Sequence, residues 1–132
     1  MATTYTPQKQ TLQLEDYPHA IAQARAAIAR CDQRIAELEA DIERRNARFE
    51  RQVAEDSDLK NDTQRRAALK DYRYKDDQYQ GWLALLRNQQ EKRIQQDIRL
   101  ELLRSSFSVA KLQARQRIAD MVAGGDGLAL VA

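Results

Sequence analysis

The chain has little of the chemistry that most enzyme and metal sites require. Its 132 residues include one cysteine, Cys31, and one histidine, His19. A single cysteine excludes an internal disulfide, and so few His and Cys side chains leave a soft metal such as zinc without ligands. No glycine-rich phosphate loop is present, and the acidic residues lie among Lys and Arg as ordinary helix-surface pairs. We therefore expect no enzyme, no metal or other cofactor, and no small-molecule substrate.

Glycine, proline and long apolar runs are also scarce. The chain has 4 Gly and 2 Pro, whereas 32% of its residues are charged, a balance typical of long exposed helices. No apolar run approaches the roughly 20 residues that span a bilayer, and no basic region followed by a hydrophobic one opens the chain. We expect a cytoplasmic protein that does not bind membranes.

The first third of the chain carries a heptad repeat. After a helix-start signal at Asp16 to Pro18, apolar residues recur in the a/d pattern of a coiled coil. The repeating positions are Ile21, Ile28, Ile35, Ile42 and Phe49, with Ala24, Cys31, Leu38, Arg45 and Gln52 between them. Because Arg45 and Gln52 are polar, the apolar seam should weaken toward residue 55.

Two further helix starts follow the polar stretch "EDSDLKND". Asn61 with Gln64 three residues later predicts a capped short helix of about ten to twelve residues. Asp77 with Gln80 predicts a second start. No proline separates residues 62 and 122, so one unbroken helix is the alternative; we favour a bend near Asp76 and Asp77.

The last helix is expected to run to about Val122, where "GGDG" ends it. Its apolar stripe comprises Leu100, Leu103, Phe107, Ala110, Ala114, Ile118 and Met121, preceded by Leu83, Leu86, Ile94 and Ile98. The register slips between Gln89 and Gln96. In an antiparallel hairpin Arg45 would lie opposite this interval, either as a polar layer that fixes the register or beside a solvated gap.

These patterns predict an all-α fold, a long antiparallel helical hairpin (coiled coil) with a short helix at the connecting end. The expected organisation is a mobile N-terminal arm (1–15), a helical hairpin domain (16–122) and a flexible C-terminal tail (123–132). The last four residues, Ala129 to Ala132, resemble the end of a bacterial degradation tag, which leaves rapid turnover as an open hypothesis. Because a seam of two helices is thin, we expect a homo-oligomer.

Three of the five tyrosines and the only tryptophan lie between Asp58 and Trp82, among eleven charged side chains. Three interpretations remain open: the rings fold the short helix over the hairpin end together with Phe49, they stack on nucleic-acid bases, or they bind a protein. The candidate partner-binding residues are Arg65, Arg66, Tyr72, Tyr74, Tyr79 and Trp82.

Residues 87–117 carry eight basic and three acidic side chains, a net charge of +5 within a chain of net charge +2. Such a segment could contact a phosphate backbone, but charge runs on coiled coils also solubilise a face or pair with acidic partners. A membrane surface is disfavoured because Phe107 is its only aromatic anchor. The candidate nucleic-acid-binding residues are Arg99, Arg104, Lys111 and Arg115.

The run "LKNDTQRRAAL", followed by "DDQYQGWLALL" and "IRLELLRSSFSVAKLQAR", resembles small coiled-coil helical proteins encoded by phages and other mobile elements. In that group a turn of the pattern K-N-acidic-x-x-R, here Lys60, Asn61, Asp62 and Arg65, separates two long helices. The resemblance implies a context of mobile DNA. We therefore expect a non-enzymatic interaction or accessory factor that binds a protein partner through the hairpin end or the helix faces. The alternative is a DNA-binding accessory protein in recombination or replication.

Overall fold

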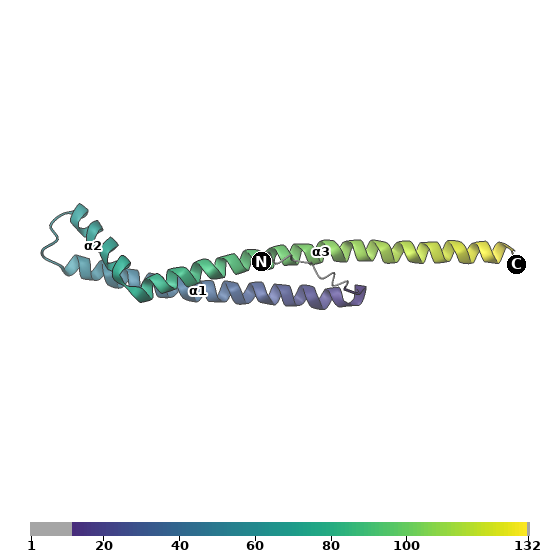
Figure 1. The fold of residues 1–132 in the computed structure, drawn as a ribbon, viewed down its shortest axis with the longest axis horizontal. Coiled ribbons are helices and arrows are strands. Elements are labelled where there is room, and N and C mark those ends of the chain that lie inside the picture. The colour runs from purple at the N-terminus through teal and green to yellow at the C-terminus, as the bar shows by residue number, and fades with distance from the viewer. Residues whose placement is uncertain (1–11, 132) are drawn as a thin grey trace, which may run out of the picture. The chain divides into compact units, whose positions relative to one another are not determined.

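The structure of the protein is a computed structural model that describes residues 12–131, with side chains as far as residue 124. Within this range it contains a short 3-10 helix, Leu14–Asp16, and three α-helices: α1 (Tyr17–Glu55), α2 (Asp62–Lys75) and α3 (Asp77–Val131) (Figure 1). The described residues contain no strand, which confirms the predicted all-α class. None of these helices is long and apolar enough to cross a membrane.

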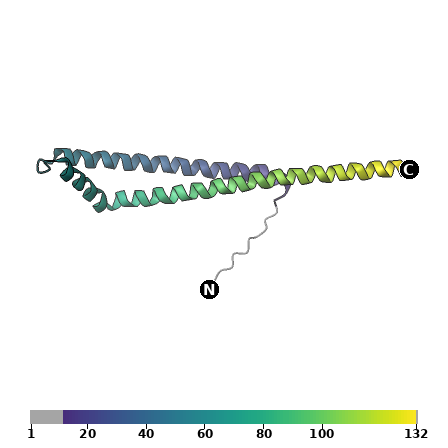
Figure 2. The same ribbon diagram turned by 90° about the horizontal axis from the view of Figure 1, so that it is seen from above.

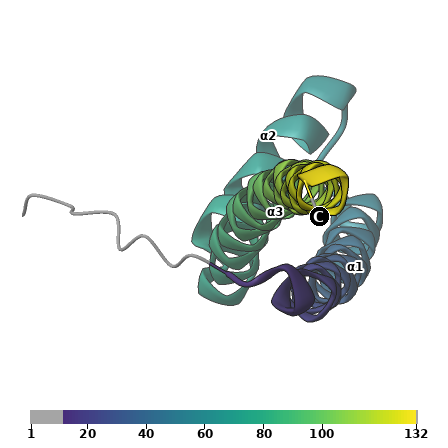
Figure 3. The ribbon, with the colours of Figure 1, turned by 90° about the vertical axis from the view of Figure 1, so that its right-hand side faces the viewer.

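The chain divides into two compact units. Unit 1 combines the chain through Arg25 with α3 from Ile98 onward, and unit 2 comprises residues 26–97. In unit 2 the chain runs out along α1 and returns along α3, so Asp32 pairs with Arg93 and Arg45 with Asp76. The loop and α2 connect these two helices (Figures 2 and 3). Unit 2 is therefore an antiparallel helical hairpin with a short helix at its connecting end, as predicted.

The heptad pattern on α1 correctly identifies most of the buried side chains of unit 2. Cys31, Leu38 and Phe49 are buried, and Leu38 has no exposed surface. The prediction for Gln52 is wrong: Gln52 is exposed and Val53 is buried. A step of four residues from Phe49 keeps Val53 on the inner side, since a helix turns once in 3.6 residues and alternates steps of three and four.

The predicted cap at Asn61 is confirmed, but the residue that caps the start of α3 is Asp76 and not the predicted Asp77. The backbone N–H of Gln64 donates to Asn61 Oδ1 at 2.9 Å, and the backbone N–H of Lys60 donates to Gln64 Oε1 at 2.8 Å. At the other end Asp76 adopts an extended conformation, which separates α2 from α3. Its carboxylate accepts the backbone N–H of Tyr79 at 2.7 Å and so caps the start of α3. The bend at Asp76 is confirmed.

The predicted apolar stripe of α3 in unit 2 is confirmed at Leu83 and Leu86, which are partly buried, but is wrong at Ile94. Ile94 is 59% exposed, whereas Arg93 and Gln96 are partly buried. From Tyr79 through Leu86 the inward-facing residues of α3 follow one another by three or four positions. Continuing these steps leads to the polar residues Arg93 and Gln96, because the backbone of α3 shows no irregularity that would rotate its inner face. Arg45 accordingly does not lie opposite the glutamine-rich interval but bonds to Asp76, next to the bend.

In unit 1 the start of α1 packs on α3. Tyr17 stacks on Phe107, with ring centroids 5.5 Å apart, and Leu100 is buried. The stripe from Leu100 to Ala114 is at least partly buried, as expected, but Ile118 and Met121 are exposed. The physical reason is that α1 begins at Tyr17, level with Phe107, so the described part of α1 does not reach them.

Both chain ends differ from the sequence-based prediction in their described parts. The expected mobile arm falls mostly on residues 1–11, outside the described range, but Leu14–Asp16 form a 3-10 helix in which the Asp16 carboxylate accepts the backbone N–H of Gln13 at 3.1 Å. The predicted helix end at Val122 is wrong, because α3 continues to Val131. An interior glycine costs a helix only about 1 kcal/mol relative to alanine, so "GGDG" alone does not stop it. The degradation-tag hypothesis falls on side chains outside the described range.

Candidate functional site

Three aromatic rings close the connecting end of unit 2. Phe49 on α1 is buried; Tyr72 of α2 stacks on it with centroids 5.9 Å apart, and Tyr79 of α3 meets it edge-on at 5.7 Å. Both arrangements are favoured aromatic geometries. This contact confirms the interpretation in which the rings fold the short helix over the hairpin end.

A charged network fixes the bend beside these rings. Arg45 Nη1 donates to Asp76 Oδ2 at 2.6 Å, Arg45 Nη2 donates to Gln78 Oε1 at 2.7 Å, and the guanidinium lies 5.0 Å from the Trp82 ring centroid. The pKa of Asp76 is lowered from its ordinary value, chiefly by the hydrogen bond from the backbone N–H of Tyr79. Burial acts in the opposite direction, and the hydrogen bond and charge of Arg45 and the charge of Arg48 lower the pKa further. Asp76 is therefore held as a carboxylate.

A shallow hollow lies next to this network, with a volume of about 300 Å³. Its lining residues are Arg45, Arg48, Phe49, Gln52, Tyr72, Lys75 and Asp76. Arg45 is neutralised by Asp76 and Lys75 pairs with Asp71 at 3.0 Å, whereas Arg48 has no ion-pair partner among the described residues. The hollow could accept an acidic side chain of a partner against Arg48.

The six candidate partner-binding residues of this region do not form one surface. Tyr79 is only 6% exposed, so its ring packs inside the hairpin end and offers little to a partner. Tyr72 and Trp82 are partly buried, while Tyr74 is 79% exposed. Arg65 and Arg66 are exposed, and Arg65 pairs with Asp62 at 3.3 Å. Tyr74 is the one ring of the set that is mostly exposed to solvent.

An apolar surface that sequence reasoning missed lies on α3 in unit 1. Ile98, Leu102, Val109 and Leu112 are 56%, 63%, 52% and 62% exposed. Steps of four, seven and three residues place them on one side of a helix, opposite the stripe that contains Leu100 and Phe107. We call these four residues the outer apolar face. The sequence contains this second row of apolar residues at helical spacing, but the sequence-based prediction assigns only Ile98 to a face. It places Ile98 in the buried stripe, and that prediction is wrong.

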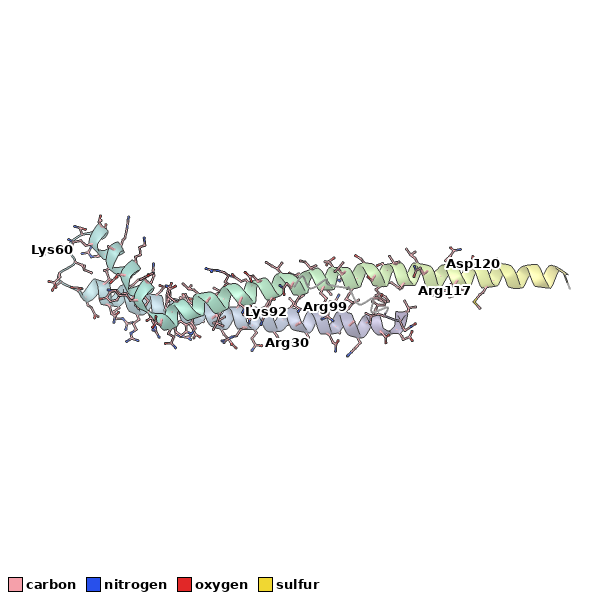
Figure 4. The ribbon with its side chains drawn as sticks, in the orientation of Figure 1. Arg30, Lys60, Lys92, Arg99, Arg117 and Asp120 are labelled. Carbon is pink, nitrogen blue, oxygen red and sulfur yellow. The ribbon has the colours of Figure 1, made fainter. Side chains whose placement is uncertain are left out.

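The four candidate nucleic-acid-binding cations divide between two flanks of this face. Arg104, Lys111 and Arg115 follow one another by seven and four residues and share one flank. Arg99 lies on the other flank with Arg117, and both side chains project from α3 (Figure 4). Two of the four have intrahelical contacts: Arg104 pairs with Glu101 at 3.2 Å, and the Lys111 ammonium lies 4.4 Å from the Phe107 ring centroid.

A groove of about 420 Å³ runs between α1 and α3 in unit 2. Its lining residues are Glu39, Ile42, Glu43, Asn46, Ala47, Glu50, Leu83 and Leu86. Ile42, Leu83 and Leu86 are partly buried and form an apolar floor, whereas the three glutamates are exposed on the rim. None of these glutamates has an ion-pair partner within the described part of the chain. We call this feature the acidic groove.

No group of three or more His, Cys, Asp or Glu side chains within the described range is placed to hold a metal ion. Cys31 is buried and free. A comparison with protein-family models, with curated proteins and with solved structures finds no match to this chain. The candidate surfaces are therefore the hairpin-end hollow, the acidic groove and the outer apolar face with its basic flanks.

Proposed function

We propose that the protein is a non-enzymatic interaction factor that binds a protein partner through the outer apolar face of α3. The hairpin end, with the exposed ring of Tyr74 and the hollow beside Arg48, provides a second contact surface. The resemblance at Lys60 to Arg65 to helical proteins of phages and mobile elements supports an accessory role in such an element, acting in the cytoplasm.

The observation that carries this proposal is the exposure of four large apolar side chains along one line of α3. Each of the four is more than half exposed, and they follow one another over four helical turns. Covering such side chains would gain roughly 25 cal/mol for each Å² of apolar surface removed from water. Contiguous apolar surface of this kind marks interaction sites in proteins, whereas singly scattered apolar residues do not.

The basic residues support the DNA-binding alternative less well. Arg99 lies on a different flank from Arg104, Lys111 and Arg115, so the four do not form one track for a phosphate backbone. An apolar face lies between the two flanks, and hydrocarbon side chains gain nothing from phosphate oxygens. This arrangement instead suits a protein partner that has an apolar strip bordered by acids.

Site-specific photo-cross-linking tests the proposal. A photoreactive phenylalanine analogue is introduced in place of Val109, and a control protein carries it in place of the exposed Arg30 on α1. We expect protein adducts from position 109 and few or none from position 30. Binding to labelled single-stranded and duplex DNA is measured in parallel at about 50 and 200 mM salt, where phosphate-driven binding differs strongly. Absence of protein adducts from position 109, or DNA binding that is lost in an Arg104→Gln/Lys111→Gln/Arg115→Gln variant, would overturn the proposal.

A further inference from the structure

We infer that the partner of the outer apolar face is the acidic groove of a second copy of the same chain. This inference rests on the proposed function, because it names the protein that the face binds. It joins two surfaces that have been described separately, the basic and apolar side of α3 in unit 1 and the acidic groove in unit 2.

The charges of the two surfaces are complementary. Glu39, Glu43 and Glu50 border the groove, and none of them is neutralised by a described cation. Glu39 and Glu43 are four residues apart on α1, an arrangement in which like charges repel on a helix surface. Cations from another chain would relieve this repulsion and would hold the rim against the partner.

The basic flank shows the same situation with the opposite sign. Lys111 and Arg115 are also four residues apart, and Arg115 has no ion-pair partner among the described residues. The pair between Arg104 and Glu101 is exposed, and exposed pairs of this kind contribute little, so Arg104 can exchange partners readily. Each surface thus carries an uncompensated charge that the other surface can neutralise.

The spacings of the two sets match in one direction only. The glutamates follow one another by four and then seven residues, whereas the cations follow by seven and then four. If α3 of one copy lies antiparallel to α1 of the other, Arg104 comes level with Glu50, Lys111 with Glu43, and Arg115 with Glu39. A parallel alignment brings at most two of the three pairs level.

Leu112 of the outer apolar face agrees with the antiparallel alignment. The register that pairs Lys111 with Glu43 places Leu112 level with Ile42 on the groove floor. Leu112 is 62% exposed and belongs to the outer apolar face, so docking would bury its side chain against Ile42, Leu83 and Leu86. The ion pairs set the register of the two helices, and the apolar contact removes the Leu112 side chain from water.

Because the contact joins two different surfaces, it is heterologous and can repeat from copy to copy. The mass measured by sedimentation equilibrium is therefore expected to rise with concentration and to fall when salt is raised, since screening weakens exposed ion pairs. A wild-type protein that stays monomeric at millimolar concentration and low salt would overturn the inference.

Charge reversal gives the decisive test. A groove variant, Glu39→Lys/Glu43→Lys/Glu50→Lys, and a flank variant, Arg104→Glu/Lys111→Glu/Arg115→Glu, are each expected to be monomeric alone with unchanged helical content by circular dichroism. In the groove variant both surfaces are basic, and in the flank variant both are acidic. Mixed in equal amounts, the two variants present opposite charges to each other, and we expect association to return.

A matched control reverses cations on the other flank. Arg99→Glu/Arg117→Glu changes charge on the same helix without touching the proposed pairs, and we expect it to self-associate as the wild type does. Association that persists in both triple variants, or that does not return on mixing, would overturn the inference.

The register is checked in a Cys31→Ala background. Oxidation is expected to link Glu43→Cys in one copy to Lys111→Cys in another, and to leave Glu43→Cys with Arg99→Cys unlinked. The reverse pattern of links would overturn the antiparallel register.

The photo-cross-links from position 109 separate this inference from the proposed function. Adducts of two copies of the chain support both. Adducts that contain only a different protein leave the proposed function standing and overturn the inference. Absence of any adduct overturns both.

Discussion

Removing the Phe49 ring should detach α2 from the end of unit 2. Phe49 is 5% exposed and contacts both Tyr72 on α2 and Tyr79 on α3. No residue of α2 is itself fully buried, so α2 depends on this contact more than on a core of its own. We therefore choose Phe49→Ala as the perturbation that most directly tests how the connecting end is held.

The magnitude follows from the burial and the two ring contacts. Truncation of a buried phenylalanine to alanine costs about 3–5 kcal/mol, and each aromatic pair adds about 0.5–1.5 kcal/mol beyond burial. Because the site lies near the end of a hairpin and can partly collapse, we expect a loss of about 3 kcal/mol in the free energy of unfolding. Phe49→Leu keeps most of the apolar volume and loses the ring pairs, so its cost should be about 1–2 kcal/mol.

The assay is urea unfolding followed by circular dichroism, at two protein concentrations because self-association would add apparent stability. Arg51→Ala, at an exposed position with no ion-pair partner among the described residues, is the matched control and should change stability by less than about 0.5 kcal/mol. Hydrogen exchange should show faster exchange of the α2 amides in Phe49→Ala. A loss below about 1 kcal/mol, or α2 amides that exchange as in the wild type, would refute the reasoning.

Three further predictions concern α3 and its start. Asp76→Asn should cost about 1 kcal/mol at pH 7 by circular dichroism, and because the folded-state pKa of Asp76 is lowered, its contribution should be complete above the ordinary value of about 3.9 and fade as the pH falls further; equal losses at pH 7 and pH 2 would contradict this. Gln96→Leu should raise the free energy of unfolding in urea by about 1 kcal/mol, because the buried Gln96 Oε1 has no hydrogen-bond partner among the described residues; a lower free energy of unfolding would show that the amide is satisfied. Ile94→Gln should be nearly neutral, whereas Leu100→Gln should cost about 2–4 kcal/mol, and similar costs for both would restore the sequence-derived register.

Local capping chemistry explains why the helix boundaries at the connecting end could be predicted. Asn61 and Asp76 each accept a backbone N–H three residues later, an interaction that depends on neighbouring residues only. The far end of α3 could not be predicted in the same way, because the cost of "GGDG" is small and is decided by the rest of the helix.

The candidate site was predicted less well than the fold. Proximity of rings in sequence indicated a cluster at the hairpin end, but whether each ring points inward or outward depends on how α2 packs, so Tyr79 is buried and Tyr74 is exposed. The outer apolar face was missed for a related reason. The identity of an apolar residue does not show whether its side chain faces α1 or solvent. Because α3 carries apolar residues on two opposite sides, the sequence does not show which side is buried.

The sequence by itself determined the all-α class, the seam of α1 and the bend at Asp76, because heptad spacing and capping residues act within a few helical turns. Only the tertiary structure decided which side of α3 meets α1 and which contact Arg45 makes. Those choices depend on how two helices align over their shared length, and a register shift of a single step exchanges buried and exposed residues without changing any local preference.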